Sequence, residues 1–148
     1  MTKSIKITFL ALLAVFIYVM FGQQFLRMAI SEEWFMNSAI APLIFWLPYL
    51  IFISLSVRLI ILVSKEKVEG KLRKFLLLTG IAPLVMFGSI ILHNLVYGLF
   101  IVLFGENFWE RIGIGDEPFF FILAVIICPI AFLVGATGTI VLFIKEKK

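Results

Sequence analysis

The chain has few of the charged residues that a water-soluble protein needs to cover its surface. Only 15% of its 148 residues are charged, whereas 63% are hydrophobic, and the mean hydropathy is +1.16. A soluble domain of this length could not cover so much apolar surface with so few charges. This composition excludes a soluble globular domain and indicates a protein whose solvent is lipid.

Cysteine and histidine are nearly absent, and this excludes several kinds of site. Cys128 is the one cysteine, so the chain can form neither an internal disulfide nor a Cys-x-x-Cys redox or zinc motif. His93 is the one histidine, so bis-histidine ligation of haem would require a second chain. Soft ligands for a metal are missing beside it, and no pattern resembles a nucleophile with its base. We therefore expect no cofactor, no metal and no enzyme activity.

Four long apolar stretches predict an all-α fold, a bundle of four transmembrane helices with short loops in a single transmembrane domain of residues 1–148. About 20 helical residues cross the hydrocarbon layer, which is roughly 30 Å thick. The predicted spans cover residues 5–28, 39–63, 75–104 and 118–144. The third is longer than a bilayer requires, so it must tilt, project or break. Each span after the first contains an internal proline, which we expect to shape the helix rather than to gate it.

The first span has a competing interpretation as a cleavable signal peptide. Lys3 and Lys6 precede its apolar run, as basic residues do in a secretory signal. The run is long, however, and no pair of small residues follows it at the spacing of a cleavage site. We therefore expect the span to be retained.

The basic residues predict how the chain is oriented in the membrane. Ten of the thirteen Lys and Arg residues lie in the two termini and the middle loop, whereas the first and third loops hold only Arg27 and Arg111. By the positive-inside rule, both termini and the middle loop lie in the cytoplasm, which places the chain in a cytoplasmic membrane. The first and third loops carry acidic residues instead: Glu32, Glu33, Glu106, Glu110, Asp116 and Glu117. The net charge of +4 then reflects contacts with lipid head groups, not with nucleic acid. Three tryptophans mark the expected outer boundary: Trp34, Trp46 and Trp109.

Polar side chains inside the spans are the first candidates for function, because they are costly in lipid. They lie toward the outer ends of the first and third spans and at the start of the fourth. If these helices lie side by side, one polar cluster forms from Gln23, Gln24, Arg27, His93, Asn94, Tyr97 and Glu117. Such a cluster could bind a ligand or accept a proton, because histidine is the side chain that changes charge near neutral pH. The alternative, which we favour, is that these groups form hydrogen bonds from helix to helix.

Small residues on the fourth span predict a surface for close helix packing. Cys128, Ala131, Gly135 and Gly138 recur at spacings of three, four and three, which places them along one side of the helix. In lipid, helices associate through close backbone approach, which small side chains permit. We expect this seam to pack against the first or third span of the same chain, and a dimer seam is the alternative.

Arg58 is a charged residue inside the second span. It lies about six residues, or roughly 9 Å, from the cytoplasmic end of that helix. Its side chain is therefore expected to reach the head groups along the lipid surface. The alternative is a buried ion pair with Glu66 or Glu69 from the middle loop.

The third loop, residues 105–117, alternates apolar and charged residues. Its apolar residues are Phe108, Trp109, Ile112 and Ile114. This pattern is typical of an interfacial helix that lies on the membrane, here followed by a glycine turn. A loop that binds a partner is the alternative.

Several families of small four-span proteins are excluded by residues that they require. The first span lacks the membrane-embedded glutamate of small multidrug exporters, and the cysteine pairs of vitamin K epoxide reductase-like, disulfide-forming and claudin-like proteins are absent. The stretch from His93–Asn94 through Glu117–Pro118 to Cys128–Pro129 resembles uncharacterised small four-span prokaryotic membrane proteins. This resemblance covers the last third of the chain and implies no particular activity.

The function expected from these features is that of a non-enzymatic accessory or scaffold protein. The short loops leave no soluble domain for chemistry, and few polar groups are available to line a path. We expect its partners to be the lipid bilayer and either a homo-oligomer or a larger membrane complex. The rival hypothesis is a small proton-coupled permease that uses the polar cluster around His93.

Overall fold

The structure is a computed structural model that describes residues 2–30 and 40–146 and contains no strand within these ranges. Glu32, Glu33 and Trp34, which entered the prediction of orientation, lie outside the described residues. The helical elements, in chain order, are α1 (Lys3–Ile17), the π-helix η1 (Tyr18–Gly22), α2 (Gln23–Ala29), α4 (Ala41–Lys65), α5 (Gly70–Phe104), α6 (Phe108–Arg111), α7 (Pro118–Ile122), the π-helix η2 (Leu123–Ile127) and α8 (Cys128–Glu146).

Four helical stretches are long and apolar enough to cross a membrane. They cover residues 3–26, 46–65, 70–104 and 118–145. The predicted all-α fold with four transmembrane helices is therefore confirmed. The main difference lies in the third span, since α5 begins at Gly70 rather than at Phe75 and runs unbroken for 35 residues.

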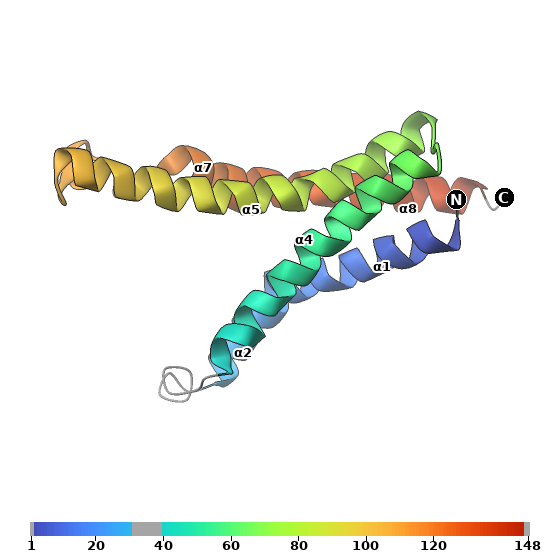
Figure 1. Cartoon of the computed structure of the whole chain (residues 1–148), viewed down its shortest axis with the longest axis horizontal. Helices are drawn as coiled ribbons and strands as arrows, with labels where there is room; N and C mark the ends of the chain where they lie inside the picture. Colours follow the sequence, from blue (N-terminus) through green and yellow to red (C-terminus); the bar gives the residue numbers. More distant parts are fainter. Residues whose placement is uncertain (1, 31–39, 147–148) are drawn as a thin grey trace.

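The helices form two arms that meet at one end and diverge at the other (Figure 1). One arm pairs α5 with α7, η2 and α8, and the other pairs α1 and η1 with α4 and continues into α2. Both chain termini and the turn between α4 and α5 lie where the arms meet, which we call the terminal end; the opposite end is called the far end. A chain that crosses a membrane an even number of times must have both termini on the same side, and this arrangement agrees with that requirement.

Aromatic side chains from three helices fill the centre of the junction. Phe16 of α1 stacks on Phe132 of α8, with ring centroids 4.1 Å apart, and Phe52 of α4 lies 6.1 and 5.8 Å from these two rings. All three are buried. Each such pair adds about 0.5–1.5 kcal/mol beyond the area that it buries. These rings join α1 to α8 and so hold the two arms together about midway along the first span.

Glycines allow the closest helix approaches, and these lie toward the terminal end. A Cβ atom at Gly135 of α8 would lie only 2.8 Å from the backbone nitrogen of Thr79 on α5. A Cβ atom at Gly80 of α5 would lie 2.9 Å from Cγ1 of Ile60 on α4. By contrast, nothing lies within 4 Å of a Cβ atom built at Gly88 or Gly98, farther along α5. Close backbone packing therefore binds α4, α5 and α8 at one end and leaves the arms free to separate at the other.

Two π-helical turns interrupt the first and last spans. In η2, the N–H of Cys128 donates to the carbonyl of Leu123, five residues back. Pro129 follows directly; its ring removes one backbone donor and crowds the carbonyl four residues back, so a widened turn accommodates it. The other turn, η1, contains no proline and was not predicted from the sequence.

Candidate functional site

His93 lies at the centre of a polar cluster near the far end of the α5–α8 arm. Its Nδ1 lies 3.2 Å from the backbone oxygen of Glu117 and 3.3 Å from Oε2 of the same residue. Its Nε2 lies 3.5 Å from Oδ2 of Asp116. Both ring nitrogens thus face oxygen atoms, and a ring nitrogen that carries a proton can donate to them.

Glu117 starts α7 and is the most buried member of the cluster. Its side chain is 6% exposed. Its Oε1 accepts hydrogen bonds from the backbone N–H groups of Phe119 at 2.8 Å and Phe120 at 3.2 Å, while Pro118 takes the first helical position. A carboxylate at the N-cap followed by proline is a favourable helix start. Glu117 therefore both caps α7 and links it to His93 on α5.

Aromatic rings extend the cluster toward the end of α5. Tyr97, one turn after His93, stacks on Trp109 of α6 with ring centroids 5.8 Å apart and an interplanar angle of 7°. The indole nitrogen of Trp109 also donates to the backbone oxygen of Tyr97 at 3.2 Å. Arg111 donates to the backbone oxygen of Phe104, the last residue of α5. The loop thus folds back onto the helix that precedes it.

The predicted interfacial helix of this loop is reduced to the four residues of α6. Trp109 is buried against α5, and the ring of Phe108 packs against those of Phe100 and Phe104. Two other apolar residues of the loop, Ile112 and Ile114, remain exposed. The glycine turn is present, since Gly113 adopts a positive φ of 74°.

The structure does not bring together all seven residues of the expected cluster. His93, Tyr97 and Glu117 lie close together, whereas Asn94 is exposed and donates to the backbone oxygen of Ile90 on its own helix. The other three, Gln23, Gln24 and Arg27, belong to α2 at the far end of the other arm (Figure 1). The expected convergence of the first and third spans does not occur there, because the two arms diverge toward the far end (Figure 1).

Two members of the cluster were missed in the sequence. Asp116 faces His93, and Trp109 covers Tyr97. The sequence Asp116–Glu117–Pro118 indicates a helix start, and this pattern places both carboxylates beside the same helix terminus. The contact between Trp109 and Tyr97 has no such signal, because it depends on how the loop folds back.

The small residues of α8 face the interior of the same chain. Cys128 and Gly135 are buried, and Gly138 lies directly against the ring of Phe75 on α5. Ala131 is half-buried and packs against the core. The structure thus places the small-residue seam between α8 and α5, the third span.

Arg58 is exposed on α4, and neither of the ion pairs formed by the described residues involves it. Glu66, one of its two possible partners, instead accepts a hydrogen bond of 2.6 Å from the hydroxyl of Thr2. Exposure of Arg58 argues against the buried ion pair, and its reach to the head groups stays a prediction.

The carboxylate oxygen atoms of the His93 cluster already contact the N–H groups of α7 and the histidine ring. Within residues 2–30 and 40–146, no group of three or more His, Cys, Asp and Glu side chains is arranged to hold a metal ion. No family model, curated protein or solved structure matches the chain.

Proposed function

We propose that the chain is a multi-pass protein of a cytoplasmic membrane, with both termini in the cytoplasm, that acts as a non-enzymatic accessory or scaffold subunit. Its four apolar helices and the concentration of Lys and Arg in the termini and the middle loop support this orientation. The role as a subunit is supported by how the polar and apolar groups are arranged.

The observation that carries the proposal is that the polar cluster is engaged in structural bonds, while the junction is closed by aromatic rings. His93 and Glu117 link α5 to the start of α7. Phe16, Phe52 and Phe132 fill the space between the arms nearer the terminal end. A carrier needs polar groups at successive depths, whereas these rings provide none. The arrangement therefore favours a protein that holds its shape over one that moves a solute.

The divergence of the arms also favours association with other membrane components. At the far end, Phe25 on α2 is 76% exposed and Val102 on α5 is 82% exposed. Lipid can cover such residues, but two separated arms also offer long apolar faces to neighbouring transmembrane helices, which associate through van der Waals packing.

Site-specific photocrosslinking in native membranes tests the proposal. A photoreactive amino acid is placed at Phe25, at Val102 and, as a matched control, at Leu10, which is 61% exposed on α1 near the terminal end. We expect a discrete protein adduct of reproducible mass from at least one far-end position and none from Leu10. Adducts with lipid alone at all three positions, together with a monomeric mass in native membranes, would contradict the subunit role.

A small proton-coupled permease is the second candidate, and the two carboxylates beside His93 favour it. In proteoliposomes that contain a pH-sensitive dye, a permease would produce a proton flux that His93→Gln abolishes while the protein stays folded. We expect the wild type, the His93→Gln variant and protein-free vesicles to show the same flux.

A further inference from the structure

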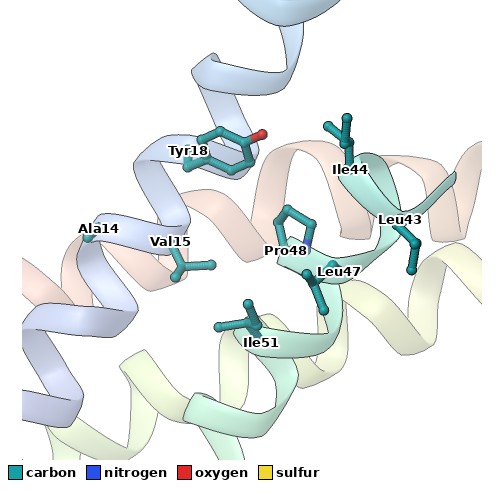
Figure 2. Close-up of a pocket in the computed structure, with 8 residues that line it drawn as sticks. All are labelled: Ala14, Val15, Tyr18, Leu43, Ile44, Leu47, Pro48 and Ile51. Carbon is teal, nitrogen blue, oxygen red and sulfur yellow. The ribbon is translucent and has the colours of Figure 1, made fainter. Parts of the chain in front are cut away.

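A groove of about 450 Å³ lies between the first span and α4 (Figure 2). This volume falls within the range of small-molecule pockets, about 300–1,000 Å³. The groove is open to one side and almost wholly apolar. Its lining residues come from α1, η1 and α4: Ala14, Val15, Tyr18, Leu43, Ile44, Leu47, Pro48 and Ile51.

Backbone irregularities on both helices shape this groove. Tyr18 is the first residue of η1, and π-helical turns of this kind occur frequently at functional sites. Its ring lies over Gly22, where an added Cβ would come within 2.7 Å of Cδ2 of the tyrosine, so the glycine permits this ring position. On the facing helix, Pro48 removes the donor that the carbonyl of Ile44 would otherwise use.

The groove contains one polar side chain, and its hydrogen-bonding capacity is unused. The hydroxyl of Tyr18 extends across the groove toward Ile44 and Pro48 of α4 (Figure 2). No hydrogen bond among the described residues involves this hydroxyl. A hydroxyl in an apolar environment is costly unless it has a partner, so a ligand that brings an acceptor would be favoured here.

The position of the groove in the span indicates where such a ligand comes from. α1 has 15 residues, so Tyr18 lies roughly 22 Å along the helix from Lys3, in the half of the bilayer remote from the termini. Leu43, Leu47 and Ile51 on its rim are exposed and therefore face the hydrocarbon. Charged side chains are absent from the lining, so the site selects for a neutral part of a molecule. Membrane glycerolipids combine an apolar chain with ester carbonyls that accept hydrogen bonds.

We propose that this groove binds one glycerolipid acyl chain from the surrounding leaflet, and that the Tyr18 hydroxyl donates to an ester carbonyl of that lipid. The aliphatic residues contact the chain, and the hydroxyl fixes its position along the groove. This lipid site is independent of the proposed role as a subunit, because it requires only the α1–α4 arm.

Native mass spectrometry of the full chain in detergent, with defined lipids added, tests the site. The probes are dioleoyl phosphatidylcholine and its diether analogue, which lacks the two ester carbonyls. We expect the wild type to retain one ester lipid and to bind it roughly five- to tenfold more tightly than the diether lipid, as one neutral hydrogen bond would give.

Two variants test the contribution of the hydroxyl and that of the groove separately. Tyr18→Phe keeps the ring and should bind both lipids equally, at the weaker affinity. Ala14→Phe fills the groove and should retain neither lipid. The controls are Tyr97→Phe for loss of a hydroxyl and Val125→Phe for added volume on the exposed surface of η2, and both should behave as the wild type.

Three results would overturn the proposal. One is a wild type that retains no lipid above the level of the detergent background. Another is equal affinity of the wild type for the ester and diether lipids. The third is an ester preference that persists in Tyr18→Phe. Because this last variant changes no volume, it keeps the test decisive even if Ala14→Phe does not fold.

Discussion

Replacement of Gly135 is predicted to be among the most damaging single changes in the chain. A Cβ atom at this position would lie 2.6 Å from Oγ1 of Thr79, 2.8 Å from its backbone nitrogen and 2.9 Å from the backbone oxygen of Phe75. Two of these three atoms belong to the backbone of α5, so no rotation of a side chain can relieve the contact. Helices α5 and α8 must move apart by several tenths of an ångström.

The loss of folding stability can be estimated from this separation of the two helices. A gap of about 0.5–1 Å between two packed surfaces removes a quarter to a half of the attractive energy of each dispersion contact. Overpacking of a well-packed core typically costs about 1–3 kcal/mol of stability. Gly135→Ala offsets part of this cost through its better helix propensity, which is worth about 1 kcal/mol. Gly135→Leu places three more carbon atoms at this contact than Gly135→Ala does. We therefore expect it to lower the free energy of unfolding by about 3 kcal/mol or more and to impair folding.

Gly88 provides the matched control, because it lies on α5 with nothing within 4 Å of an added Cβ. Gly88→Ala should be neutral or should raise the free energy of unfolding by up to about 1 kcal/mol. Unfolding in mixed detergent and SDS micelles, followed by circular dichroism, measures the stability of all three variants. Equal stability of Gly135→Ala and Gly88→Ala would refute the close approach of α8 to α5. A Gly135→Leu variant that folds normally but loses only an oligomer would show that the seam lies between chains.

Four further predictions concern the cluster, the charge on α4 and the orientation. Glu117→Ala should lower the free energy of unfolding by about 0.5–2 kcal/mol because α7 loses its N-cap, and detergent unfolding should show Glu117→Asp closer to the wild type. His93→Ala should lower stability by about 1 kcal/mol, as the loss of an interhelical hydrogen bond does, and an unchanged melting temperature would contradict the bond to Glu117. Arg58→Lys should change stability by less than about 0.5 kcal/mol, because lysine also reaches the head groups; a large loss of folding would indicate a bidentate buried pair instead. Reporter fusions after Lys67 and at Gly113 should read cytoplasm and outside, respectively, and the opposite result at either site would contradict the orientation.

The number and type of the helices could be predicted from the sequence because they depend on local composition. A run of about 20 apolar residues must cross the bilayer as a helix, since lipid offers its backbone no hydrogen-bonding partners. The predicted spans accordingly agree with the helices within a few residues, apart from the early start of α5 at Gly70. The small side chains of α8 likewise indicated close packing, although their spacing alone could not identify α5 as the partner.

The relative placement of the helices could not be predicted, and this explains the error in the polar cluster. Gln24 and His93 lie at similar predicted depths, but depth carries no information about lateral distance. That distance depends on where α4 and α5 approach each other, which is at Gly80 rather than at Gly88, although both are glycines on one helix. The π-helical turn that begins at Tyr18 could not be predicted from the sequence either, because it contains no proline.

The close contact between Gly80 and Ile60 lies near one end of α5, so small changes in the angle between α4 and α5 would have large effects at the other end. Most of α5 extends past this contact, so about 24 residues, or roughly 36 Å of helix, lie on its far side. A rotation of the arm by about 10° about that point would displace the far end by roughly 6 Å, while the backbone near Gly80 would hardly move. We therefore expect a side-chain change at this contact that alters the angle between α4 and α5 to change the spacing between α2 and α6. Substitutions at Ile60 should consequently alter the far end of the molecule more than substitutions made there.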